Sequence, residues 1–385
     1  MFTRLCLPFF LIFQLGCKKP SLPTVETKSS FQFAIPALSK GINLSNWFND
    51  YSDPTQYGTR FSLASLQQIK SLGFTYVRIP IGSTILYNST APSVLNSSQL
   101  SLVDAAVKNA IDAGLGVTLN LHPWKNDMDS LLAADPLMVN KVSLYWMSMA
   151  AYFKKYPSDK LFFEVYNEPH ASAAGLTTKP PSWWAHVQEL LIAAIRSQTS
   201  GHYIIAGGES WNSIEGLLNL NPSSQPKVIY NFHFYDPFLF THQGAGWAGW
   251  EPAQVGKNIP YPSTPEGVTP LISSTYNTAL QNALRWYGSQ RYNSDSLNKW
   301  IKRVAQWAQD KNVMLICNEF GSYKPNAPRQ SRLTYLQDVR SILEQYKIGW
   351  AMWEYDEGFG LTDYVGGNRN NPVTDNEILT ALGLR

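Results

Sequence analysis

Short apolar runs alternate with longer amphipathic segments from residue 40 onward. The apolar runs predict β-strands over 41–47, 76–81, 116–122, 161–168, 203–208, 228–235, 313–320 and 349–355. The segments between them predict helices over 63–72, 100–113, 139–156, 183–198, 297–309 and 332–346, because apolar residues recur there at three- and four-residue spacing. The stretch after residue 208 is short, and its pattern is less regular.

This alternation predicts one α/β domain, a (β/α)₈ barrel over residues 40–385. Alternating strands and helices require a parallel sheet, and eight such units are the number that closes a TIM barrel. The chain exceeds the usual barrel size of about 250 residues, and the surplus lies mainly at 236–295, after the sixth strand. Trp247, Trp250 and Tyr261 lie there among many Gly and Pro residues. Because long loops are uncommon unless they serve a function, we expect an aromatic-rich binding loop here rather than a disordered insertion.

The N-terminus has the layout of an export signal. One positive charge, Arg4, precedes a short apolar run, and Cys17 follows Gly16. The segment resembles a bacterial lipoprotein signal, with 1–16 removed and Cys17 lipidated; a plain signal peptide cut nearby is the alternative. Residues 17–39, rich in Ser, Thr, Pro and Lys, then predict a flexible tether. Both alternatives predict export, and the first adds a lipid anchor in a membrane at Cys17.

Composition narrows the class of partner. A formal charge of +3 without a dense Lys/Arg run argues against nucleic-acid binding. Aromatic residues make up 13% of the chain, enough to fill a core or to form platforms for sugars.

With Cys6 removed and Cys17 lipidated, Cys317 is alone, so we expect no disulfide. Cys317 shares the strand alternation of Glu319 and could line the cavity, although packing is the simpler role. We expect a monomer.

Two glutamates at strand ends carry the predicted chemistry. In a TIM barrel the functional residues gather at the C-terminal ends of the strands. Glu168 ends the fourth predicted strand and Glu319 the seventh, so their side chains can approach a bound chain from opposite sides. Two carboxyl groups about 5–5.5 Å apart suit a retaining glycosidase. No metal or other cofactor is required by this pair.

The strand ends also carry a set of family motifs. These are "GINLSNW" (41–47), "VRIP" (77–80), "NLHPW" (120–124), "VYNEP" (165–169), "NFHFYDP" (231–237), "CNEFG" (317–321) and "AMWEY" (351–355). Over roughly residues 40–360 the sequence resembles glycoside hydrolase family 5, the cellulase family of clan A, and in particular its bacterial endoglucanases. The two glutamate motifs in this order around eight strands are specific, whereas either tripeptide alone is not.

The resemblance implies a role for each matched residue. Glu168 would be the acid/base and Glu319 the nucleophile. Asn167 would bind the sugar 2-hydroxyl, and Arg78 would keep Glu319 ionised. Further substrate contacts are expected at His122, His233, Tyr235 and Trp353, and also at Trp47, Trp211 and Trp247.

The expected function is endo-β-1,4-glucanase activity on a β-linked polysaccharide or oligosaccharide. The alternatives within the family are β-mannanase, β-1,3-glucanase, xyloglucanase and transglycosylase activity. Two alternatives come from other classes. A glycan-capture lipoprotein without catalysis would have no need of two glutamates. A metal-dependent hydrolase would need a His/Asp/Glu ligand cluster, and the sequence does not predict a suitable one. Glu209 could bind substrate or cap a helix. The acidic cluster Glu354, Asp356 and Glu357 is expected to be a solvated loop.

Overall fold

The computed structural model describes residues 35–124, 128–170, 183–369 and 371–384. The predicted signal peptide 1–16, Cys17 and most of the predicted tether lie outside the described residues. Among the described residues, no helix combines the length and the hydropathy needed to cross a bilayer.

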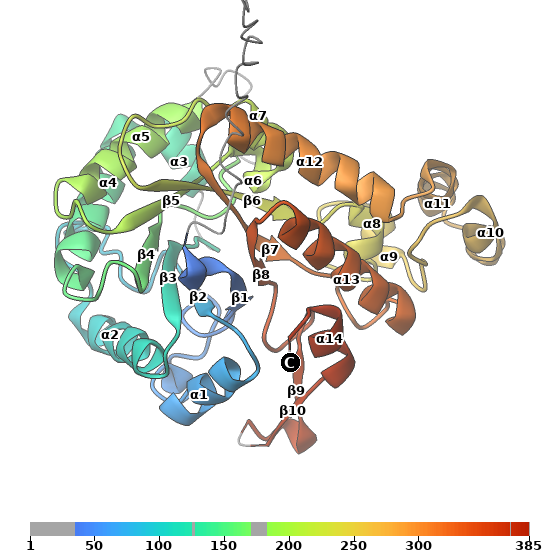
Figure 1. Ribbon diagram of the computed structural model, residues 1–385, viewed down its shortest axis with the longest axis horizontal. Helices are drawn as coiled ribbons and strands as arrows, with labels where there is room; N and C mark the ends of the chain where they lie inside the picture. The colour runs from blue at the N-terminus through green and yellow to red at the C-terminus, as the bar shows by residue number, and fades with distance from the viewer. Residues whose placement is uncertain (1–34, 125–127, 171–182, 370, 385) are drawn as a thin grey trace, which may run out of the picture. The chain divides into compact units, whose positions relative to one another are not determined.

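Eight parallel strands form a closed barrel with the strands in sequence order, as predicted (Figure 1). Closure occurs at Gly41, which pairs with Tyr76 on one side and with Ala351 on the other. A Cβ atom at Gly41 would lie 2.3 Å from the Tyr76 ring, so glycine is required for this close approach. The strands are β1 (Lys40–Asn43), β2 (Tyr76–Ile81), β3 (Gly116–Leu121), β4 (Leu161–Glu164), β5 (Tyr203–Gly207), β6 (Val228–Phe234), β7 (Met314–Phe320) and β8 (Gly349–Met352).

Helices surround the barrel, and local capping residues set several of their ends. Ser62 accepts a hydrogen bond from the Ser65 N–H at the start of one helix, and Asn293 does the same for Ser296 at the start of another. The helices in the ring are α1 (Leu63–Ser71), α2 (Ser97–Asp112), α3 (Met128–Ala134), α4 (Pro136–Phe153), α5 (Trp183–Arg196), α6 (Glu209–Asn212), α7 (Ile214–Leu218), α12 (Ser294–Lys311) and α13 (Arg329–Gln345). All six predicted helices are present, with ends shifted by a few residues.

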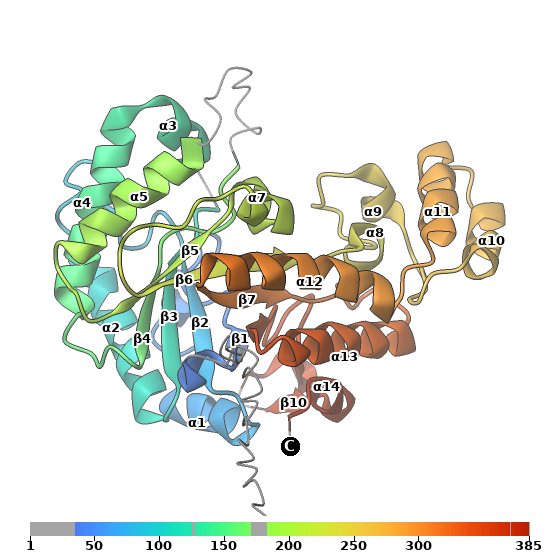
Figure 2. The ribbon, with the colours of Figure 1, turned by 45° about the horizontal axis from the view of Figure 1, so that its top comes forward.

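The segment after β6 is not the loop that its glycines and prolines suggested. It folds into four helices, α8 (Phe238–Thr241), α9 (Glu251–Val255), α10 (Pro265–Ser274) and α11 (Thr278–Gln290). Figures 1 and 2 both place α10 and α11 beyond the outer ends of α12 and α13. Proline at the first helical position of α10 and side-chain caps at Thr264 and Asn277 explain why a Pro-rich sequence is helical here.

The inward-facing side chains form layers along the barrel axis. The lowest layer is apolar and closes the N-terminal end; it comprises Leu38, Tyr76, Phe162, Ile205, Ile229, Ile316 and Ala351. Two residues further along several of these strands, the inward positions are polar, and they include Arg78, Glu164 and Asn318. Because side chains alternate along a strand, this change in polarity separates a sealed floor from a polar interior.

The folded domain begins slightly before residue 40. Pro36–Leu38 form one turn of 3₁₀-helix, and Leu38 is buried in the lowest layer of the barrel. The predicted tether boundary at residue 39 is therefore too late, because Leu38 fills the barrel floor. After β8 the chain adds a small hairpin, β9 (Thr362–Tyr364) and β10 (Pro372–Thr374), and ends in α14 (Asn376–Ala381).

Candidate active site

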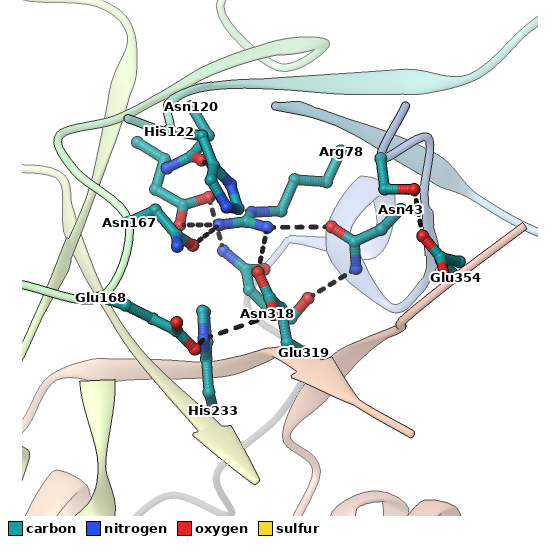
Figure 3. A network of polar contacts seen from close by, with 12 residues as sticks. Asn43, Arg78, Asn120, His122, Asn167, Glu168, His233, Asn318, Glu319 and Glu354 are labelled. Carbon is teal, nitrogen blue, oxygen red and sulfur yellow. Dashed lines mark hydrogen bonds and ion pairs between the residues drawn. The ribbon is translucent and has the colours of Figure 1, made fainter. Parts of the chain in front are cut away.

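Arg78 lies at the centre of a buried polar network in the upper half of the barrel (Figure 3). Its guanidinium forms a bidentate ion pair with Glu164, with N–O distances of 2.7 and 2.8 Å. Nη1 donates to Glu319 at 2.6 Å and to Asn43 Oδ1 at 2.9 Å, and Nη2 donates to Asn167 Oδ1 at 2.8 Å. One buried cation on β2 therefore binds side chains from β1, β4, β7 and the segment that follows β4.

A β-bulge in β7 brings Glu319 into this network. In the pairing of β6 with β7, Phe232 faces Cys317 and His233 faces Glu319, so Asn318 is an extra residue. The bulge lets adjacent Asn318 and Glu319 both reach Arg78 or its partners, because a bulge changes the direction of a side chain. We expected Cys317 to line the cavity because strict strand alternation would point it to the same side as Glu319. The bulge interrupts this alternation between the two residues. Cys317 is fully buried in the core outside the barrel, and its packing role is the one observed.

Glu168 approaches Glu319 from the opposite side of the barrel. β4 ends at Glu164, and Glu168 follows with a positive φ of 47°. Its Oε1 lies 2.7 Å from His233 Nδ1, which is also 3.6 Å from Glu319 Oε2. One oxygen of each glutamate and a ring nitrogen of His233 all lie within 4.8 Å of one another. This separation is closer to the roughly 5–5.5 Å between the carboxyl groups of retaining glycosidases than to the roughly 6.5–9.5 Å of inverting ones.

Among the described residues, Glu168, His233 and Glu319 also form a group whose ligand atoms lie close enough together to hold a metal ion. Their atoms are already satisfied by hydrogen bonds. Tyr235 donates its hydroxyl to Glu319 Oε2 at 2.9 Å, Arg78 donates to Oε1, and His233 Nδ1 forms a hydrogen bond of 2.7 Å with Glu168 Oε1.

The two glutamates have different electrostatic surroundings. Burial raises the pKa of Glu168 to about 7, although 28% of its side chain remains exposed to the cleft. Burial also raises the pKa of Glu319, but His233, Arg78 and the Tyr235 hydroxyl act in the opposite direction. Burial lowers the pKa of His233 to about 4, so the imidazole is neutral at pH 7. Near neutral pH one carboxyl group can thus carry a proton while the other is ionised.

Most of the other predicted contacts lie at this site. Asn167 is 8% exposed and bound to Arg78, and Trp353 is 8% exposed. The His122 ring stacks near Trp353, with 5.8 Å between centroids, and burial lowers the pKa of His122 well below its usual value. Trp211, which is 50% exposed, stacks on His170 at 4.5 Å, next to Glu168.

Of the predicted aromatic contacts, Trp47 is buried in the core, whereas Trp247 is exposed. Trp47 is only 2% exposed, stacks on Phe48 and donates its indole N–H to the Tyr57 carbonyl, so the prediction that it binds sugar is wrong. Its ring is part of the hydrophobic core. Trp247 is 64% exposed and packs edge-on against His242, which in turn contacts Tyr235. The His242 ring therefore connects Trp247 to Tyr235, whose hydroxyl donates a hydrogen bond to Glu319.

The prediction of a solvated acidic loop after β8 is wrong for two of its three residues, since only Glu357 is exposed. Glu354 and Asp356 are 4% and 1% exposed. Arg60 and Arg369 both pair with Asp356, at 3.0 and 2.7 Å, and Glu354 accepts hydrogen bonds from Ser45 and from the Phe359 N–H. Arg60 is 296 residues from Asp356 in the chain, whereas Arg369 is 13 residues away, so only the partnership with Arg60 is remote in the sequence.

Sequence reasoning missed three residues of the network: Asn43, Glu164 and Asn318. Asn318 donates to Glu164 at 2.9 Å, and Asn43 donates to the Asn318 carbonyl at 2.9 Å. Glu164 precedes Glu168 by four residues within a buried apolar run. A charge in such a run was a usable signal, since an ionised carboxylate is buried only when it is paired.

Comparison with known proteins agrees with this geometry. Residues 28–358 match the family model for cellulase (glycosyl hydrolase family 5). The chain therefore belongs to the cellulase family, glycosyl hydrolase family 5.

Relatives and solved structures show the same likeness. Endoglucanase 3 of Fibrobacter succinogenes is 27% identical over 370 residues, which cover 90% of this chain but only 55% of that protein. Endoglucanase C of Acetivibrio thermocellus is 27% identical over 359 residues, which cover 91% of this chain and 99% of that protein. The structure of Thermotoga maritima Cel5A in complex with cellobiose has a TM-score of 0.71 and 27% identity, and the match covers 90% of this chain and 97% of that one. Cel5A has also been solved with mannotriose.

The pKa values predict a bell-shaped dependence of kcat/KM on pH. The family resemblance assigns Glu168 the role of the acid, which carries a proton, so the rate should fall as pH rises through about 7. It assigns Glu319 the role of the nucleophile, which is ionised, so the acidic limb should lie above the usual glutamate pKa. In Glu164→Gln the loss of a negative charge should move the alkaline limb to lower pH, since Glu164 raises the pKa of Glu168.

Full pH profiles of the parent and of Glu164→Gln test this expectation, with Glu215→Gln as the control. Glu215 pairs with Arg303 on the surface, at 2.5 Å and with 65% exposure. An alkaline limb that stays in place in Glu164→Gln, in a protein whose thermal unfolding shows it to be folded, contradicts the electrostatic role of Glu164.

Proposed function

We propose that this protein is a retaining endo-β-1,4-glucanase in which Glu319 is the nucleophile and Glu168 the acid/base. The observation that carries the proposal is the proximity of the two carboxylates, with oxygens within 4.8 Å and one of them bound to Arg78. Such a pair suits double displacement, in which the separation of the carboxyl groups is about 5–5.5 Å.

In the first step, a Glu319 oxygen attacks the anomeric carbon and the glycosidic C–O bond breaks. The proton of Glu168 moves to the leaving oxygen, and a covalent glycosyl-enzyme forms. Arg78 and Tyr235 donate to the two oxygens of Glu319, which holds the nucleophile in place and ionised. In the second step, Glu168 takes a proton from water, the water oxygen attacks the same carbon, and Glu319 is released.

Two inversions at one carbon give net retention. Proton NMR of the product, recorded before mutarotation, should therefore show the β-anomer first. Initial release of the α-anomer would contradict the two-step mechanism. Product analysis at high substrate concentration separates hydrolysis from the transglycosylase alternative, since transfer to sugar gives products longer than the substrate.

The choice of β-1,4-glucan rests on the endoglucanase names of the relatives and on the cellobiose complex of Thermotoga maritima Cel5A. The mannotriose complex of the same enzyme keeps β-mannan as the main alternative. β-1,3-Glucan and xyloglucan are further alternatives. The glycan-capture alternative is less favoured because such a protein has no need of two glutamates with opposed electrostatic surroundings.

Substrate class and catalytic pair can be tested together. Reducing-sugar release from carboxymethylcellulose, mixed-linkage β-glucan, laminarin, xyloglucan and galactomannan should be greatest on the β-1,4-glucans. Glu168→Ala and Glu319→Ala should each lower the rate by several orders of magnitude, because each removes one of the two groups that act in the transition state. Activity that survives in both variants contradicts the assignment, and binding without hydrolysis in the parent would favour the capture protein.

We also propose that the protein is exported as a monomer and anchored by lipid at Cys17. The apolar run before Gly16-Cys17 supports this proposal. In bacterial cells grown with a radiolabelled fatty acid, the parent should carry label and fractionate with membranes. Cys17→Ala should lose the label, and a labelled Cys17→Ala protein contradicts the anchor.

A further inference from the structure

The backbone of Glu168 has a conformation that residues other than glycine adopt rarely. Its φ of 47° lies in the left-handed region, which a side chain tolerates only where the surrounding structure stabilises it. The residue before it, Asn167, is still bonded to β3, since its N–H donates to the Leu121 carbonyl at 2.9 Å. The direction of the Glu168 carboxyl group depends on the backbone that carries it. Groups that fix this backbone therefore also fix the carboxyl group.

His170 binds the backbone of Glu168 from two residues further along the chain. Its Nδ1 lies 2.9 Å from the Glu168 carbonyl oxygen. Because a carbonyl oxygen only accepts hydrogen bonds, Nδ1 carries the proton in this contact. The bond closes a short loop over Glu168, Pro169 and His170, with the glutamate at its first position.

Asp129, in the first turn of α3, orients His170. Its Oδ1 accepts the His170 backbone N–H at 3.3 Å, and its Oδ2 lies 3.8 Å from His170 Nδ1. The two side chains are largely shielded, with 19% of Asp129 and 24% of His170 exposed. Burial raises the pKa of Asp129 to about 6, while the charge and the backbone N–H of His170 act in the opposite direction. One carboxyl group from α3 therefore contacts both the backbone and the ring of His170.

A strained turn after β5 contacts the same short loop. Ser210, Trp211 and Asn212 have φ values of 61°, 60° and 51°, so three successive residues other than glycine are left-handed. The Trp211 N–H donates to the Pro169 carbonyl at 3.4 Å, and its ring stacks on the His170 ring with 4.5 Å between centroids. Strained backbone persists only where its surroundings impose it, and it gathers at functional sites. The loop that begins at Glu168 is thus held by residues from two other segments of the chain.

We propose that Asp129 and His170 are positioning residues for the acid/base, which hold Glu168 in the conformation from which its proton reaches the glycosidic oxygen. This inference rests on the proposed function. When the glycosidic C–O bond breaks, its electron pair stays on the leaving oxygen, and that oxygen takes the proton of Glu168. Asp129 and His170 exchange no atom in this step. They act through the distance between the carboxyl group and the oxygen, where a displacement of about 1 Å can cost roughly 100-fold in rate.

The dependence of the rate on the leaving group tests this role. A sugar alcohol needs a proton in order to leave, whereas 2,4-dinitrophenolate leaves without one. In His170→Ala and in Asp129→Ala, kcat/KM for cellotetraose should fall roughly 10- to 100-fold. For 2,4-dinitrophenyl β-cellobioside it should change little, because kcat/KM reports the step that breaks the glycosidic bond. Glu168→Ala should show the same contrast, with a larger loss on cellotetraose.

Conservative variants and a matched control separate the contacts from general damage. His170→Asn keeps an N–H donor near the position of Nδ1, and Asp129→Asn keeps an acceptor for the His170 N–H. Each should recover part of the kcat/KM for cellotetraose that the matching alanine variant loses. The control is His186→Ala, which removes an exposed histidine from α5 and should leave kcat/KM for both substrates unchanged.

The outcomes separate this inference from the proposed function. Equal losses on both substrates in His170→Ala and Asp129→Ala indicate a general structural role and overturn the proposal, as does an unchanged kcat/KM for cellotetraose. A contrast in Glu168→Ala that is missing from the other two variants overturns the positioning role alone. Equal losses on both substrates in Glu168→Ala contradict its assignment as the acid. A parent that cleaves neither substrate contradicts both the proposed function and this inference.

Discussion

The arrangement of the site depends on the burial of one guanidinium, that of Arg78, inside the barrel. A buried cation is costly unless ion pairs and hydrogen bonds compensate for its lost hydration, and removal of one partner from such a pair costs about 3–5 kcal/mol. Arg78 meets this requirement with two carboxylates, Glu164 and Glu319, and with the amide oxygens of Asn43 and Asn167. The same bonds that compensate for the burial of the cation also fix Glu319 and Asn167, the residue before Glu168. Stability and preorganisation of the site therefore have the same physical source.

The polar layer around Arg78 is possible because the barrel is sealed below it. Tyr76, Phe162 and Ile316 lie in the apolar layer that closes the N-terminal end, two residues before Arg78, Glu164 and Asn318 on the same strands. This floor keeps water from reaching the ion pairs from below, and it raises the pKa values of groups above it by desolvation. The opposed surroundings of Glu168 and Glu319 follow from their positions: Glu319 contacts the cation directly, whereas Glu168 faces the cleft beside a neutral imidazole.

The polar residues of the site lie at the strand ends, and the loops that follow the strands surround them. A buried carboxylate, Asp50, joins the loops after the first three strands, and a buried ion-pair cluster around Asp356 stabilises the loop after the eighth. In the segment after β6, the His242 ring contacts both Trp247 and Tyr235.

The sequence by itself determined the barrel, the order of its strands and the two glutamates, because apolar runs and helical spacing are local signals and the glutamate motifs lie within a few residues each. It also indicated most of the residues around the pair. Tertiary structure alone decided the rest. The bulge in β7 that turns Glu319 inward, the burial of Trp47 in the core, and the pairing of Asp356 with Arg60 and Arg369 all depend on contacts that form only when the chain is folded. Glu164 and Asp50 belong to this second group, since a carboxylate has a role in the site only when the fold brings its distant hydrogen-bond donors to it.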